Sequence, residues 1–156
     1  MENCMVELRI REVLLENDEP IVVLEDRITD RRLVLPIGPF EASAIILEME
    51  GISPPRPLTH DLLADLFTEA GFSLDRVELF GEQASGTRAR LEYRKGLRSY
   101  EREVRPSDAL ALALRLEAPV MAEVGLLAPR ERDTLPWPRP KILILDDWKD
   151  KALRAQ

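Results

Sequence analysis

The chain has 156 residues, 45% hydrophobic and 33% charged, which fits one folded domain and excludes an intrinsically disordered chain. Its formal net charge of −7 argues against nucleic-acid binding through overall charge, because phosphate contacts need clustered Lys and Arg. The single cysteine, Cys4, excludes an internal disulfide and a cysteine-rich zinc site.

The charges are unevenly distributed. Residues 86–105 contain seven basic and three acidic side chains, so a locally basic face fits an acidic protein. No apolar run reaches the roughly 18–20 residues that span a bilayer, and the first residues do not resemble a secretory signal. We therefore expect a cytoplasmic protein with no membrane partner.

Three strands are predicted in the first forty residues. Residues 6–10 alternate between apolar and charged side chains, residues 21–24 are a β-branched run, and residues 32–36 begin a third strand. The polar residues 25–31 are expected to form a turn. Three helices and further strands then alternate along the chain.

The first helix is predicted from Phe40 to Gly51, where glycine ends it. A second helix starts at Thr59 as its N-cap and ends at Gly71. Its predicted apolar stripe consists of Leu62, Leu63, Leu66, Phe67 and Ala70. A third helix opens at Pro106-Ser107 and is apolar on most sides, which indicates a central, buried helix.

Strand patterns between and after the last two helices complete an α+β fold. The expected architecture is a mixed, mostly antiparallel sheet with three main helices. We place one domain at residues 1–128, followed by a proline-rich arm at 129–156. In that arm, Ile142–Leu145 either adds to the parent sheet or pairs with another subunit.

Two motifs carry most of the chemistry, Pro55-Arg56-Pro57-Leu58-Thr59-His60-Asp61 and Arg105-Pro106-Ser107-Asp108. Each places Arg-Pro before a hydroxyl residue at a helix start, with an acid in the first turn. In a structural interpretation the hydroxyl residues are N-caps and the acids complement the helix dipoles. In a functional interpretation the helix starts and arginines hold phosphate, and the histidine transfers a proton.

Two further groups of charged residues allow other chemistry. Carboxylates are the ligands that Mg²⁺ or Mn²⁺ use, and two metals can clamp a phosphoryl transfer. The basic stripe Arg88, Arg90 and Arg94 on one predicted strand is either a solvent-facing surface or a nucleic-acid track.

Three sequence blocks occur in a characteristic order. They are Leu35-Pro36-Ile37-Gly38-Pro39-Phe40-Glu41-Ala42 with Glu50-Gly51, then Pro54-Pro55-Arg56-Pro57-Leu58-Thr59-His60-Asp61-Leu62-Leu63, then Arg105-Pro106-Ser107-Asp108-Ala109-Leu110-Ala111-Leu112-Ala113-Leu114-Arg115. Over about residues 5–127 the chain resembles the bifunctional nuclease domain family. The resemblance implies an α+β domain that forms homo-oligomers and cleaves both DNA and RNA. The chain departs from many relatives where Ile37 meets Gly38 directly, without an intervening Trp and Ile.

We therefore predict a nuclease that hydrolyses DNA and RNA with low sequence specificity, as a homo-oligomer (dimer or higher), with Mg or Mn as the cofactor if there is one. The expected catalytic residues are His60, Asp61, Asp108 and Glu41. The expected substrate-binding residues are Arg56, Thr59, Arg105, Ser107, Arg88 and Arg90. The expected metal ligands are Asp61, Glu103 and Asp108. The alternative is a non-catalytic oligomeric binding or regulatory module, in which the same blocks build the subunit interface.

Overall fold

The computed structural model describes residues 4–82 and 86–129. The strands are β1 (Met5–Glu16), β2 (Glu19–Asp26), β3 (Arg31–Pro36), β4 (Ser73–Glu82), β5 (Gly86–Lys95), β6 (Arg98–Val104), β7 (Val120–Glu123) and β8 (Ala128–Pro129). The helices are α1 (Pro39–Met49), α2 (Thr59–Glu69), α3 (Pro106–Arg115) and the short 3-10 helix η1 (Val124–Leu126).

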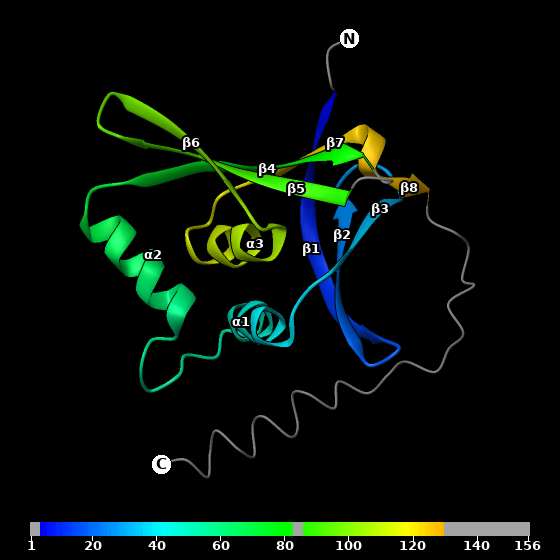
Figure 1. Ribbon diagram of the computed structural model, residues 1–156, viewed down its shortest axis with the longest axis horizontal. Helices are drawn as coiled ribbons and strands as arrows, with labels where there is room; N and C mark the ends of the chain where they lie inside the picture. The colour runs from blue at the N-terminus through cyan, green and yellow to red at the C-terminus, as the bar shows by residue number, and fades with distance from the viewer. Residues whose placement is uncertain (1–3, 83–85, 130–156) are drawn as a thin grey trace.

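The eight strands of the described residues form one sheet, in the order β6-β5-β4-β7-β1-β2-β3-β8 (Figure 1). Neighbouring strands are antiparallel except β4 and β7, which run parallel. The predicted α+β fold with a mixed, mostly antiparallel sheet is therefore confirmed. Pro129 at the end of β8 pairs with Arg31, whereas residues 130–156 and the strand predicted at Ile142–Leu145 lie outside the described residues.

The β1–β2 hairpin shows how the local sequence sets the register. Asn17 and Asp18 both have positive φ, 50° and 64°, and these two residue types tolerate that conformation better than most. Glu16 consequently pairs with Glu19 across a two-residue turn. This register places Val22 and Leu24 of β2 on the core face.

The turn predicted at residues 25–31 starts later than expected, because β2 continues through Asp26. Glu25 and Asp26 continue β2 and are buried, at 6% and 7% exposed. Arg9 and Arg11 of β1 donate hydrogen bonds to Glu25 at 2.8 and 3.0 Å, and the Thr29 hydroxyl donates to Asp26 at 2.5 Å. Because these contacts satisfy both carboxylates, the strand extends through two residues whose polarity predicted a turn.

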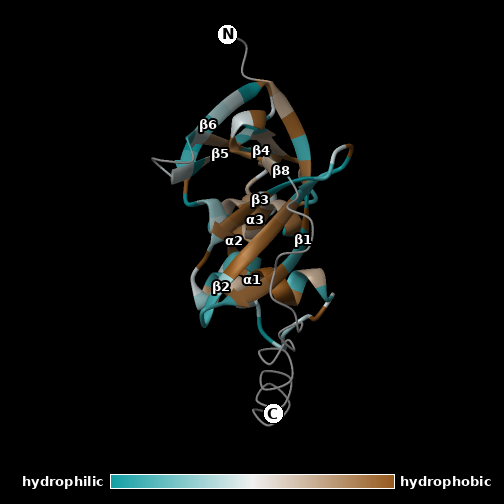
Figure 2. Ribbon diagram, turned by 90° about the vertical axis from the view of Figure 1, so that its right-hand side faces the viewer, coloured by the Kyte–Doolittle hydropathy of each residue, from teal (hydrophilic) through white to brown (hydrophobic). Residues whose placement is uncertain are grey.

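Helices α1, α2 and α3 lie on one face of the curved sheet (Figure 1). Helices α1 and α3 lie side by side, with α1 against β1 and β2 and α3 against β4 and β5. The most deeply buried large side chains include Leu24, Ile45, Leu79 and Leu110, which join the two halves of the sheet to both helices. Figure 2 shows the apolar residues concentrated along β2, α1 and α3. The prediction that the third helix is central and buried is confirmed.

Helix α2 differs from its prediction. Of its residues only Ala64 is buried, while Leu62, Leu63 and Leu66 remain 49%, 47% and 53% exposed. The helix packs through Ala64, which belongs to the core, and its start contacts α3. Near its end, Phe67 packs on a group of aromatic rings next to β5. The predicted helix is confirmed, but within the described residues the core leaves Leu62, Leu63 and Leu66 of its apolar stripe uncovered.

Among the described helices, none is long and apolar enough to cross a membrane.

Candidate functional site

Helices α1, α2 and α3 begin in a common way. Each has an N-cap residue with an extended backbone and an acid as its third residue. The N-caps are Gly38, Leu58 and Arg105, and the acids are Glu41, Asp61 and Asp108. Acids in the first turn complement the partial positive charge of the helix start. The three acids make contacts that tie the helices together.

The hydroxyl residues of the two motifs are not helix caps. Thr59 is the first residue of α2 and Ser107 the second residue of α3, and no side chain of an N-cap residue makes a capping hydrogen bond. In α2 the acid takes this role, because Asp61 Oδ2 accepts the Leu58 N–H at 2.9 Å. The prediction that Thr59 and Ser107 are N-caps is therefore wrong. The last extended residue before α3 is Arg105.

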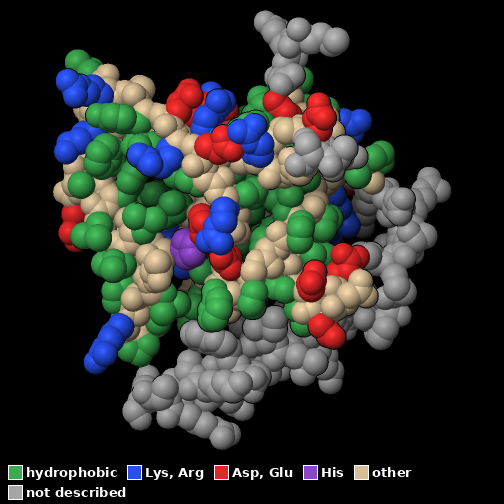
Figure 3. Space-filling view, viewed as in Figure 1, with side chains coloured by type: hydrophobic (Ala, Val, Ile, Leu, Met, Phe, Trp, Pro, Cys, Tyr) green, Lys and Arg blue, Asp and Glu red, His purple; other side chains and the backbone are tan. Residues whose placement is uncertain are grey.

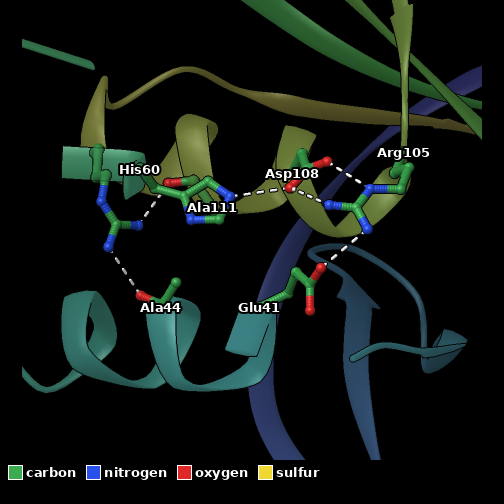
Figure 4. Close-up of polar contacts among 7 residues, drawn as sticks. Glu41, Ala44, His60, Arg105, Asp108 and Ala111 are labelled. Atoms are coloured by element: carbon green, nitrogen blue, oxygen red, sulfur yellow. Dashed lines mark hydrogen bonds and ion pairs between the residues drawn. The ribbon is translucent and has the colours of Figure 1, made fainter. Parts of the chain in front are cut away.

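Asp108 joins the starts of α2 and α3 (Figure 4). His60 Nε2 lies 3.0 Å from Asp108 Oδ1. Arg105 donates from Nε to Oδ2 at 2.7 Å and from Nη2 to Oδ1 at 3.1 Å, a bidentate contact. The two Arg-Pro-led motifs therefore meet in space, although 48 positions separate His60 from Asp108.

Helix α1 adds a fourth residue through Glu41. Its Oε1 lies 3.0 Å from Arg105 Nη1, so the same guanidinium bridges two carboxylates. The backbone at Gly38 makes room for this arrangement. A Cβ at Gly38 would lie 2.3 Å from Glu41 Oε2, so any larger residue there would displace the carboxylate. We call Glu41, His60, Arg105 and Asp108 the helix-start cluster.

The cluster is open to solvent mainly through its arginine. The Arg105 side chain is 68% exposed, against 28% for Asp108 and 15% for both His60 and Glu41. In Figure 3 the single histidine is visible at the surface beside basic and acidic side chains, with apolar side chains around them. The Arg105 guanidinium is therefore the group of the cluster that is most accessible to a ligand on this face.

Asp108 carries its charge at neutral pH. Partial burial would raise the pKa of this carboxyl, but hydrogen bonds from Arg105 and His60 outweigh burial and hold the pKa below its usual range. An ionised carboxylate accepts hydrogen bonds and does not donate them. The proton in the His60–Asp108 hydrogen bond therefore belongs to His60 Nε2.

Arg115 is a site residue that sequence reasoning missed. Its side chain is only 5% exposed. Its Nε donates to Asp61 Oδ1 at 2.6 Å, its Nη1 to the Ala111 carbonyl at 2.9 Å, and its Nη2 to the Ala44 carbonyl at 3.1 Å. One guanidinium thus joins all three helices and fixes the turn of α2 that carries His60. The sequence did contain a signal, a lone charge ending a helix predicted to be buried, because buried charges are normally paired.

The Asp61 carboxylate is consequently held by contacts that stabilise the fold. Burial would raise its pKa, but hydrogen bonds from the Leu58 N–H and from Arg115 outweigh burial and lower it. Asp61 follows His60 directly, yet its carboxylate is bound to Arg115 at the inner side of α2.

The remaining motif residues do not join the cluster. Arg56 is exposed in the loop before α2, and no hydrogen bond or ion pair joins it to another described residue. Thr59 is exposed at the start of α2, whereas Ser107 is 8% exposed within the first turn of α3.

Arg88 and Arg90 lie on the opposite face of the sheet. They alternate along β5 with Ala89 and Leu91, whose side chains pack in the same core as α3. Arg88 makes a bidentate ion pair with a glutamate, Glu103, at 2.7 and 2.6 Å. Arg90 donates from Nη2 to Glu78, a buried acid of β4. The two arginines therefore do not join the helix-start cluster.

The predicted metal ligands are not brought together. Glu103 pairs with Arg88, and Asp61 pairs with Arg115. Asp108 contacts His60 and Arg105. In residues 4–82 and 86–129 no group of three or more His, Cys, Asp or Glu side chains is arranged to hold a metal ion. The described residues do not fit a metal centre built from protein ligands alone, and we derive no catalytic step through one.

These features define an α+β protein in which three helix starts hold a histidine, an exposed arginine and two carboxylates in one cluster. A family model for the bifunctional nuclease domain matches residues 22–133, and the chain belongs to that family. Two curated relatives are the uncharacterized proteins MT1877 and Rv1829 from Mycobacterium tuberculosis strains CDC 1551 / Oshkosh and ATCC 25618 / H37Rv. Each is 39% identical to this chain over 137 residues, covering 83% of this chain and 82% of the relative.

Proposed function

We propose that the protein is a nuclease that hydrolyses phosphodiester bonds of DNA and RNA at the helix-start cluster. Membership of the family supports nuclease-like chemistry. The observation that carries the proposal is the position of Asp108, whose two oxygens hold His60 and Arg105 at once. A group that transfers protons and a cation that binds phosphate are thereby fixed next to each other.

Arg105 is the phosphate-binding residue in this proposal. Its guanidinium is exposed and bridges two carboxylates at the surface, so it can turn one edge towards an incoming phosphate while keeping a carboxylate contact. The starts of α1 and α3 add a partial positive charge on the same side. Arg56, exposed in the loop before α2, is a second candidate for phosphate contact.

His60 is the proton-transfer residue. With Nε2 protonated and bound to Asp108, a neutral imidazole has its lone pair on Nδ1. Nδ1 accepts a proton from the attacking water as the oxygen bonds to phosphorus and the bond to the leaving oxygen breaks. The imidazolium then returns its proton to the leaving oxygen or to solvent. Asp108 orients the ring and stabilises its positive charge.

Cleavage of plasmid DNA and total RNA by purified protein tests the proposal. We expect cleavage of both substrates by the wild type, and a rate lower by about 100-fold or more in His60→Asn, the usual contribution of a general acid or base. Parallel reactions with EDTA, Mg²⁺ or Mn²⁺ determine whether a metal assists, since Mg²⁺ often binds one or two carboxylates together with substrate phosphates. Equal activity in both proteins would place the chemistry elsewhere.

One observation favours a second candidate, an oligomeric binding or regulatory module. Leu62, Leu63 and Leu66 form an apolar surface on α2 that the described part of the chain leaves half exposed. Apolar surfaces of this kind commonly mark contacts with other proteins. We propose that α2 contributes to a homo-oligomer, which is compatible with either function.

The oligomer can be tested through α2 itself. We expect the double substitution Leu62→Asp, Leu66→Asp to lower the molar mass measured by light scattering, because two charges would have to be buried in the interface. Leu97→Asp is the matched control, since Leu97 is fully exposed at the β5–β6 turn. A wild-type protein that is already monomeric, or an unchanged mass in the double variant, would refute a role for this surface.

A further inference from the structure

Phe40 is an aromatic side chain that the described residues leave uncovered. It is the second residue of α1, directly before Glu41, and 86% of its surface is exposed. The other aromatic residues of the described ranges are at least partly buried. Phe67, Phe72, Tyr93 and Tyr100 pack on one another, and the Phe80 ring is covered by two arginines.

The backbone that carries Phe40 is fixed on both sides. Pro39 restricts the first position of α1. The Glu41 carboxylate fits against Gly38 and binds Arg105 at 3.0 Å. Phe40 is thus carried on a rigid backbone, directly before a member of the helix-start cluster. A ring in such a position can bind a ligand without a large loss of conformational entropy.

The chemistry next to this ring is that of a nucleotide-binding surface. An exposed guanidinium, Arg105, is tied to the residue that follows Phe40. A nucleotide presents the complementary pair of groups, a flat base and a charged phosphate. Proteins that bind single strands combine stacking aromatic rings with basic groups that follow the backbone. The exposed leucines of α2 offer apolar area but no flat ring.

We propose that Phe40 is a nucleobase-stacking residue: an unpaired base lies on its ring while a phosphate of the same or the adjacent nucleotide contacts Arg105. This inference rests on the proposed function and adds the position of the base to it. The base must be unpaired at this point, because in a duplex both of its faces are already stacked. Stacking makes no demand on base identity, which agrees with low sequence specificity.

The test compares two strands of equal length and charge, a phosphorothioate oligothymidylate and the corresponding strand of abasic residues. Binding of each is measured by fluorescence anisotropy with wild type, Phe40→Ala and Phe40→Trp. We expect Phe40→Ala to weaken oligothymidylate binding by about tenfold or more, the usual range for one stacked base, and to leave abasic-strand binding within about twofold. Phe40→Trp should restore binding, and its added indole fluorescence should be quenched by the base-containing strand.

Each other outcome overturns the inference in a distinct way. Equal losses on both strands would mean that Phe40 acts through the fold or through Arg105. No loss on oligothymidylate would remove the stacking role while leaving the proposed function intact. A changed molar mass for Phe40→Ala would assign the ring to a subunit contact. Failure of the wild type to bind either strand or to cleave nucleic acid would remove the proposed function as well.

Discussion

Replacing Arg115 with methionine is expected to lower the free energy of unfolding by about 3 kcal/mol. Methionine retains much of the side-chain volume but leaves the Asp61 carboxylate without its partner and two helix carbonyls without their donor. Removing one member of a buried ion pair typically costs about 3–5 kcal/mol. The lower end applies here, because the Asp61 side chain keeps 21% exposure. Urea unfolding at neutral pH measures the difference.

Two comparisons make this prediction specific. Arg94→Met breaks the exposed contact with Asp75, which is 3.3 Å long, and should cost less than about 1 kcal/mol. The double substitution Asp61→Leu, Arg115→Met should cost less than the sum of its single substitutions, because no unpaired charge remains buried. If the losses in the free energy of unfolding are strictly additive, the Arg115–Asp61 pair does not stabilise the packing of the helices.

The same pair gives a pH dependence with a definite sign. The pKa of Asp61 is lower in the folded protein than in the unfolded chain, so its contribution to stability is complete above the usual carboxyl range. It is lost as the pH falls through the lowered folded-state pKa. The stability difference between wild type and Arg115→Met should therefore shrink below about pH 4. A difference that stays constant into the acid range would contradict this assignment.

Substituting Asp108 with asparagine is expected to reduce nucleic-acid cleavage by at least about 100-fold. Asparagine has nearly the same shape, but its neutral amide cannot accept from both His60 and Arg105 through two charged oxygens. The His60 ring loses the carboxylate that fixes its protonated nitrogen and stabilises its positive charge. A continuous assay with a fluorophore–quencher oligonucleotide measures the rate over a range of pH.

A matched substitution separates this effect from a general loss of charge. Asp75→Asn removes a carboxylate from a surface ion pair on β4 and should retain nearly full activity. Circular dichroism and the unfolding midpoint establish that both variants are folded. An Asp108→Asn protein with wild-type rate would show that the contact between His60 and Asp108 has no part in catalysis.

Local sequence patterns predicted most of the fold but not its long-range polar contacts. Alternating and continuous apolar runs located the strands, and Gly51 and Gly71 marked the ends of α1 and α2. Glu25 was assigned to a turn because its polarity is a local property. The arginines that allow its burial come from β1, 14 and 16 positions away. Polarity alone therefore could not indicate that β2 continues.

The candidate site was predictable in its parts but not in its connections. The Arg-Pro motifs identified His60, Arg105 and Asp108, yet spacing along the chain contains no information on whether two helix starts meet. Arg115 was overlooked because it stands at the far end of α3, where an arginine usually complements the helix dipole in solvent. Its role follows only from the packing of α1 and α2 around it.

Arg90 illustrates the opposite error of sequence reasoning. The basic stripe predicted either a solvent-facing surface or a nucleic-acid track, and in the structure Arg90 lies on the face away from the apolar residues of β5. Neighbouring strands place acids beside it, Glu78 from β4 and Glu101 from β6. Strand pairing thus neutralises a charge that appears unpaired in the one-dimensional sequence.

The central claim, that the helix-start cluster is the site of cleavage, is tested most directly by comparing His60→Asn with Arg88→Ala. These residues lie on opposite faces of the sheet, one in the cluster and one in the ion pair with Glu103. The measurement is kcat/KM for one fluorogenic oligonucleotide under identical conditions. We expect a loss of about 100-fold or more for His60→Asn and less than about threefold for Arg88→Ala. A loss confined to Arg88→Ala would move the active surface to the outer face of the sheet and contradict the assignment.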